Sequence, residues 1–246
     1  MDIFWEIHSG LPREGPGDSL STARAYAAAS GLPPQPKILD IGCGPGMQTL
    51  DLARLSRGEI IAIDFHQPFL DELVRCAKEA GVEAQIQARK LSMFEMDFER
   101  EQFDLVWSEG AIYIMGFEAG FKTCHPFLKP GGYMAVTEAS WFQPNPPRDI
   151  ADFWIKNYPG MRTIEENIQR LEGQGYKLVE YFHLPDSSWW DNYYNPLAER
   201  VAMLKEKYAD DDDALNALDE ELAEIDLFRK YSNYYGYEFY IAQKNQ

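Results

Sequence analysis

An apolar segment that runs directly into closely spaced glycines places the strongest constraint on the fold. Residues 37–41 read Lys-Ile-Leu-Asp-Ile, glycines follow at Gly42, Gly44 and Gly46, and a helical pattern begins at once. Glycine is needed where the backbone turns sharply and a ligand lies against it. In open α/β sheets that place is the crevice outside the carboxyl ends of the strands. The segment therefore predicts an α/β fold with a ligand at this loop.

Strand and helix patterns alternate after Lys37, which predicts a mostly parallel sheet. We expect strands near 37–42, 59–64, 83–88, 103–108, 132–139, 176–183 and 237–242. Helices are expected near 20–30, 46–57, 68–80, 116–127, 147–157 and 163–173. A helical pair follows, because apolar residues recur at the helical period within Leu197–Tyr208 and Leu215–Ile225. The acidic run Asp210–Asp213 lacks the spacing of a calcium loop and is interpreted as a solvated turn that caps the second helix.

The glycine loop excludes two common nucleotide sites. A dinucleotide fingerprint needs its third glycine at the position of Met47, and Pro45 has no N–H with which to hold a pyrophosphate. No Gly-Lys-Ser/Thr sequence follows, so a triphosphate loop is excluded as well. Asp40, just before the loop, would repel a phosphate but suits a ligand that carries an ammonium and a sulfonium.

Four segments together resemble the class I S-adenosylmethionine-dependent methyltransferases, with the small-molecule and quinone-type enzymes as the nearest branch. The first is Asp40-x-Gly42-x-Gly44-x-Gly46, and the second is Glu59–Asp64, which ends in an acid about twenty residues after the loop begins. Phe103–Gly110 is similar to the fourth strand of that family, and Phe127–Tyr133 to the turn into its fifth strand. The close resemblance covers about Lys37–Glu138.

This resemblance implies a Rossmann-like, doubly wound α/β fold with a helical cap. Its seven-stranded sheet would have the order 3-2-1-4-5-7-6, with the last strand antiparallel. It also implies S-adenosylmethionine as cofactor and in-line methyl transfer to a small-molecule acceptor. Ser92 stands where the family often has an acid for the adenine amine. The cofactor-binding residues that the resemblance implies are Asp40, Gly42, Cys43, Gly44, Gly46, Asp64, Phe65, Ser92, Met93, Phe94 and Ser108.

The composition of the chain limits the kinds of partner that it is expected to bind. The net charge of −17 predicts that DNA and RNA are repelled, and no cluster of Lys and Arg offsets it. No apolar run reaches the ~18 residues of a membrane span, and the acidic start lacks the basic region of a signal peptide. Three widely spaced cysteines predict reduced thiols in the cytoplasm, without a disulfide framework or a zinc site. We therefore expect no nucleic acid, membrane or metal partner, and the oligomeric state stays open.

Methyl transfer from a sulfonium mainly requires alignment, so no compact catalytic motif is expected. Glu109, just after the fourth strand, is the candidate catalytic residue, either orienting the cofactor or the acceptor or acting as a base. The alternative is a structural carboxylate that is hydrogen-bonded to nearby backbone or solvent. Arg13, in a glycine-proline turn, is a candidate for binding the carboxylate of the cofactor or of an acidic substrate. The alternative is that Arg13 is an ordinary surface arginine. Tyr113 is a candidate acceptor contact or a packing residue. His8 is a further candidate, because the N-terminal segment is expected to close the site.

The regions outside the repeating pattern are expected to form a cap over the acceptor within one methyltransferase domain, 1–246. We divide it into an N-terminal cap segment 1–36, a cofactor-binding core 37–140, cap helices with a strand in 141–234, and a final strand 235–243. Trp190 and Tyr194 are the candidate acceptor contacts, with helix packing as the alternative. Two other functions stay open: a non-catalytic module that binds S-adenosylmethionine or S-adenosylhomocysteine, and a methyltransferase acting on a macromolecule.

Overall fold

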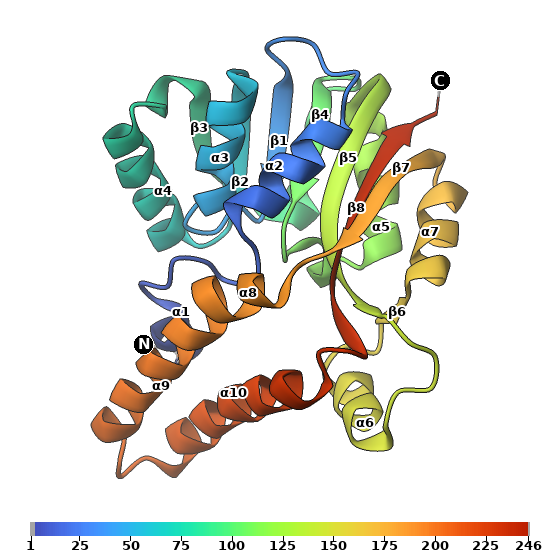
Figure 1. The fold of residues 1–246 in the computed structure, drawn as a ribbon. Helices are drawn as coiled ribbons and strands as arrows, with labels where there is room; N and C mark the ends of the chain where they lie inside the picture. Colours follow the sequence, from blue (N-terminus) through green and yellow to red (C-terminus); the bar gives the residue numbers. More distant parts are fainter. Residues whose placement is uncertain (1–2, 246) are drawn as a thin grey trace.

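One twisted sheet organises the chain, and the computed structural model describes residues 3–245 of it (Figure 1). The strand order is β3-β2-β1-β4-β5-β8-β7, in which β1–β5 are parallel and β8 is antiparallel to both neighbours. Without the two-residue strand β6, which pairs with β5, this is the predicted order 3-2-1-4-5-7-6, which is confirmed. The strands are β1 (Lys37–Ile41), β2 (Glu59–Asp64), β3 (Ile86–Lys90), β4 (Phe103–Ser108), β5 (Leu128–Trp141), β6 (Arg162–Thr163), β7 (Tyr176–His183) and β8 (Tyr235–Lys244).

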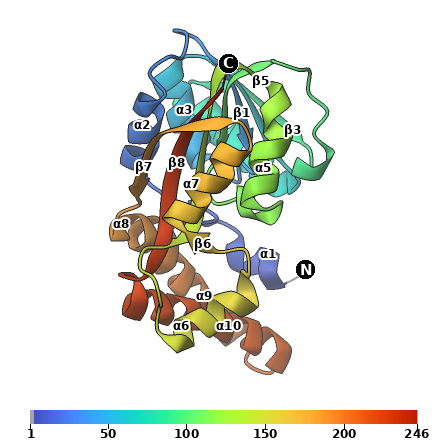
Figure 2. The ribbon, with the colours of Figure 1, turned by 90° about the vertical axis from the view of Figure 1, so that its right-hand side faces the viewer.

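Helices cover both faces of the sheet, as Figures 1 and 2 show. Helices α2 (Ser19–Ala28), α3 (Met47–Ser56) and α4 (Gln67–Ala80) share one apolar core with the first face. Helices α5 (Phe117–Cys124) and α7 (Ile164–Gly173) share a second core with the other face. Strands β1, β2 and β4 are buried on both sides, which explains why they read as nearly continuous apolar runs.

A third apolar core lies in a helical cap below the sheet in Figure 1. Asp211 begins the longest cap helix by accepting a hydrogen bond from Ala214 N at 3.0 Å, so the acidic run caps it as predicted. Glu6 ties the first helix to α9, since its backbone carbonyl accepts from Arg200 and its carboxylate from Tyr208 at 2.6 Å. The cap consists of α1 (Ile3–His8), α6 (Arg148–Asn157), α8 (Asp186–Trp189), the π-helix Trp190–Tyr194, α9 (Asn195–Lys207) and α10 (Asp212–Tyr231).

Three elements differ most from their predicted ranges. The strand expected at 83–88 begins at Ile86, because residues 83–85 form a short 3₁₀ turn in which Gln85 N donates to Val82 O. Strand β5 is longer than 132–139, because Leu128 already pairs with β4 and pairing with β8 continues to Trp141. The helix expected at 116–127 ends as an α-helix at Cys124 and continues as a 3₁₀ turn.

Other expectations concern the whole chain. The division at residues 36, 140 and 234 stays a prediction, and residues 1, 2 and 246 lie outside the described part. Within residues 3–245, no helix combines the length and the apolar character needed to cross a membrane. The three cysteines are free thiols, as expected.

The first turn of α3 requires glycine at position 46. Gly46 has φ +92°, and a β-carbon there would overlap Cδ1 of the buried Leu73 and lie 3.0 Å from its Cγ. Gly81 also has a positive φ, +69°, but has open space around it. Substitution of Gly46 therefore causes backbone strain and steric overlap, whereas substitution of Gly81 causes backbone strain alone.

We predict that Gly46→Ala lowers the free energy of unfolding by about 3 kcal/mol, since overpacking adds to the strain. Gly81→Ala is the matched control, with an expected loss of about 1 kcal/mol from strain alone. Urea denaturation measures both. Equal losses in the two variants would contradict the packing assigned to the glycine loop.

Candidate active site

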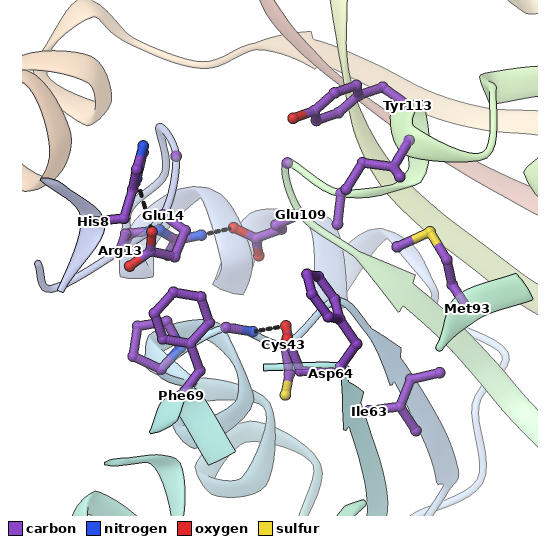
Figure 3. A pocket seen from close by; sticks show the side chains of 18 of the residues that line it. His8, Arg13, Glu14, Cys43, Ile63, Asp64, Phe69, Met93, Glu109 and Tyr113 are labelled. Carbon is purple, nitrogen blue, oxygen red and sulfur yellow. Dashed lines mark hydrogen bonds and ion pairs between the residues drawn. The ribbon is translucent and has the colours of Figure 1, made fainter. Parts of the chain in front are cut away.

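A cavity of about 710 Å³ lies between the carboxyl ends of β1, β2 and β4 and the helical cap (Figure 3). This volume falls within the usual range for small-molecule sites. Its walls come from the glycine loop, from the loops after β2, β3 and β4, from the N-terminal segment and from cap helices. The lining includes His8, Arg13, Glu14, Gly42, Gly44, Asp64, Met93, Glu109, Tyr113, Tyr193, Glu221 and Glu224.

The glycine loop forms one wall from its backbone. Gly42 N and Cys43 N donate to Ile63 O at 2.9 and 3.0 Å, which fixes the loop against the end of β2. Gly42 has φ +67°, and a side chain there would overlap the β-carbon of Ala111. The loop therefore presents main chain rather than side chains to a ligand, as the glycine spacing predicts.

Asp64 ends β2 and faces the cavity beside this loop. Its Oδ2 accepts from Gly44 N at 3.0 Å and its Oδ1 from His66 N at 2.8 Å. Burial, which is the largest influence, raises the pKa of this carboxyl. A carboxylate has about four acceptor positions, so both oxygens can still accept from the hydroxyls of a ligand.

Three residues predicted to bind the cofactor lie behind the cavity wall, and their role as cofactor ligands stays a prediction. Asp40 is fully buried, accepts from Thr49 Oγ1 at 2.6 Å, and has a pKa that burial raises to about 7. Ser108 donates to Ile41 O at 3.0 Å. Gly46 lies against Leu73. All three support the loop and the strands around it, because their side chains or β-positions point into the protein.

The other predicted cofactor residues line the cavity together. Ser92 begins a short 3₁₀ turn by accepting from Phe94 N at 3.2 Å, and this turn holds Met93 at the cavity edge. Phe65 and Phe94 remain exposed at its mouth. The predicted residues that line the cavity are Gly42, Cys43, Gly44, Asp64, Phe65, Ser92, Met93 and Phe94. Their role as cofactor ligands stays a prediction.

Glu109 and Arg13 form a buried ion pair at the cavity, pointing toward each other in Figure 3. Arg13 Nη2 donates to Glu109 Oε2, while Glu109 Oε1 accepts from Trp107 Nε1 at 2.9 Å and from Thr22 Oγ1 at 2.8 Å. Three donors make this carboxylate a poor proton acceptor, so its geometry favours positioning over base catalysis. Arg13 Nη1 is buried and has no hydrogen-bond partner among residues 3–245.

The two acceptor contacts predicted in the cap do not line the cavity, and their role stays a prediction. Trp190 lies outside the cavity, with the Arg229 guanidinium 5.1 Å from its ring centre. Tyr194 is buried beside Phe228. Tyr193, which precedes Tyr194 in the sequence, lines the cavity instead. The five-residue π-helix turns the chain differently from an α-helix, so sequence spacing gave no signal for which aromatic faces inward. Tyr113 lines the cavity, as predicted.

Sequence reasoning also missed the acidic side chains of the cavity. Glu14 lies next to Arg13 in the N-terminal turn, and Glu221 and Glu224 belong to α10, where they resemble an ordinary solvated face. His8 connects the two groups: its Nδ1 is 2.9 Å from Glu14 and its Nε2 is 3.9 Å from Glu221. Glu14 lies in the same glycine-proline turn as Arg13, which the sequence analysis singled out. No sequence pattern distinguished Glu221 or Glu224.

Comparison with known proteins agrees with this arrangement. Residues 38–132 match the family described as "Methyltransferase domain". This match covers less than half of the chain. A S-adenosylmethionine-dependent methyltransferase from Geobacter sulfurreducens, solved in complex with S-adenosyl-L-homocysteine, has a similar fold, with a TM-score of 0.81 and 21% identity. That alignment covers 100% of this chain and 98% of the other, so the two proteins share the fold of the sheet and of its cap.

Two curated proteins with similar sequences are longer than this chain. The sterol 24-C-methyltransferase erg-4 of Neurospora crassa is 26% identical over 208 residues, which cover 78% of this chain and 54% of that protein. Phosphoethanolamine N-methyltransferase 3 of Arabidopsis thaliana is 23% identical over 161 residues, covering 65% of this chain and 32% of that protein. The chain therefore spans about half or less of the length of these two relatives.

We predict that Arg13 and Glu109 are strongly coupled in stability. Glu109→Gln or Arg13→Met alone should each lower the free energy of unfolding by about 3 kcal/mol, because each leaves the other charge buried and unpaired. The double variant should lose much less than the sum, as a double-mutant cycle in urea measures. Additive losses would contradict the pairing.

Proposed function

We propose that this chain transfers the methyl group of S-adenosylmethionine to a small-molecule acceptor. The observation that carries the proposal is one continuous cavity, which joins a glycine-loop wall and Asp64 to a cap made of the N-terminal segment, Tyr193 and α10. A donor placed at the loop and an acceptor placed under the cap would share that cavity. The match of residues 38–132 to the methyltransferase-domain family supports the same reaction.

The lining residues fit the parts of this cofactor. Asp64 can accept from both ribose hydroxyls with lone pairs that remain after its two backbone contacts. Arg13 Nη1 is an unpaired buried donor that would hold a carboxylate. Met93 and Phe94 offer apolar surface for an adenine ring. When bound, the cofactor supplies an activated methyl group on a sulfonium.

The protein itself contributes alignment and the exclusion of water. Helix α1 covers the cofactor side, because Trp5 stacks on His66 with ring centres 3.9 Å apart and an angle of 5°. The same helix is tied to the cap through Glu6, which accepts from Tyr208 at 2.6 Å. Donor and acceptor would thus be enclosed between elements held at both ends.

The cavity volume of about 710 Å³ and the net charge of −17 favour a small molecule over a nucleic acid. The names of the relatives point the same way, since they specify a sterol and phosphoethanolamine. The cytoplasm remains the expected compartment. One solved structure of the same fold is the [4+2]-cyclase SpnF, with a TM-score of 0.76 and 19% identity, so the fold alone does not determine the reaction.

Asp64→Ala should weaken the binding of S-adenosylhomocysteine at least about tenfold, because two hydroxyls lose a charged acceptor. Asp71→Ala, on the exposed face of α4, is the control and should bind as tightly as the natural chain. Isothermal titration calorimetry measures both, after thermal melting has established that the variants are folded. Unchanged affinity in folded Asp64→Ala, or NAD binding in place of S-adenosylhomocysteine, would contradict the proposal.

A further inference from the structure

The cap end of the cavity carries acidic side chains. Methyl transfer to a small molecule does not by itself explain why they are there. Glu221 and Glu224 lie about one turn apart on α10 and both line the cavity. Glu14 reaches it from the N-terminal segment. Burial raises the pKa of all three carboxyls, that of Glu224 to about 7. Their charged forms are therefore costly unless a cation lies among them.

The basic side chains of the cavity do not balance these acids. Arg13 is paired with Glu109. Among the described lining residues, His8 is the other basic group, and it lies 2.9 Å from Glu14 but 3.9 Å from Glu221. Three carboxyls thus share one imidazole. Even with His8 protonated, their ionised forms leave this end of the cavity negative.

A tyrosine in the cavity wall points to a ligand independently of the acids. Tyr193 is 9% exposed as a whole residue and lines the cavity, and its hydroxyl makes no hydrogen bond to another residue within 3–245. A tyrosine hydroxyl can both donate and accept a hydrogen bond. By contrast, the adjacent Tyr194 donates to Glu224 Oε1 at 2.9 Å. The Tyr193 hydroxyl and ring are therefore available to a molecule bound beside Glu221 and Glu224.

We propose that the acceptor is a protonated amine, which binds beside Glu221, Glu224 and Tyr193 and gives its proton to Glu224. This inference rests on the proposed methyl transfer. An ammonium group donates strong hydrogen bonds to carboxylates, and the rings of Tyr193 and Tyr113 attract a cation through their faces. The acids also offset the repulsion between an ammonium and the sulfonium of the methyl donor.

The proton step explains why an acid with a raised pKa suits this place. An ammonium nitrogen has no lone pair, so it must lose a proton before it can take a methyl group. The Glu224 carboxylate accepts that proton and becomes a neutral acid. The amine then forms its bond to the methyl carbon while the carbon–sulfur bond breaks and its electrons stay on sulfur. The products are a methylated ammonium and a neutral thioether, and Glu224 finally releases the proton to water.

Binding tests the inference without turnover. Calorimetry with n-hexylammonium and benzyltrimethylammonium, in the presence of S-adenosylhomocysteine, should detect binding of both to the natural chain. Glu224→Gln should weaken both at least about tenfold, since it removes the charge and keeps the size. Its affinity for S-adenosylhomocysteine should not change. Glu220→Gln, on the exposed face of the same helix, is the matched control and should change neither affinity.

Turnover separates this inference from the function on which it rests. Transfer of a labelled methyl group should occur to primary amines and not to matched alcohols or alkenes. Glu224→Gln should reduce kcat/KM for the amine about 100-fold or more, whereas Glu220→Gln should leave it unchanged. If Glu224→Gln fails to fold, Tyr193→Phe replaces it, and an increase in KM for the amine is expected.

Different failures have different meanings. Methylation of alcohols or alkenes without amines would overturn the amine inference and leave the proposed methyl transfer standing. Full amine turnover in folded Glu224→Gln would overturn the role of Glu224. If the chain binds no S-adenosylhomocysteine and methylates none of these compounds, the proposed function fails, and the inference fails with it.

Discussion

The buried ion pair between Arg13 and Glu109 is the interaction on which the site depends. It joins the N-terminal segment, which lies outside the sheet, to the end of β4. The same carboxylate accepts from Thr22 of α2 and from Trp107 of β4, so one side chain connects three parts of the chain. Because both charges are buried, separating them would be costly, and the segment is held over the cavity.

This pair also divides the cavity chemically. On one side, the glycine loop and Asp64 present backbone and a carboxylate that already has backbone partners. On the other side, Glu221 and Glu224 have raised pKa values and face few cations. Polar groups arranged before a ligand binds can discriminate between acceptors, because only a complementary molecule relieves their desolvation.

The sheet and the cofactor side were predictable from sequence, whereas the acceptor side was not. Strand and helix periods, with glycines that only a tight turn explains, predict the alternating elements of the core, whereas the strand order came from the resemblance to a family. The cap follows no such rule: the π-helix at Trp190–Tyr194 turns Tyr193 inward, and Glu224 looks like any solvated helix residue. The motif position of Asp40 does not reveal that its carboxylate accepts from Thr49 behind the loop.

A crystal structure with S-adenosylhomocysteine tests the central claim most directly. The account predicts that the ligand lies in the cavity between the glycine loop and the cap, with its ribose hydroxyls hydrogen-bonded to Asp64 and its carboxylate to Arg13. The open end of the cavity would then lie between the ligand sulfur and Glu224. A ligand bound elsewhere, or bound here without contact to Asp64 and Arg13, would contradict the account.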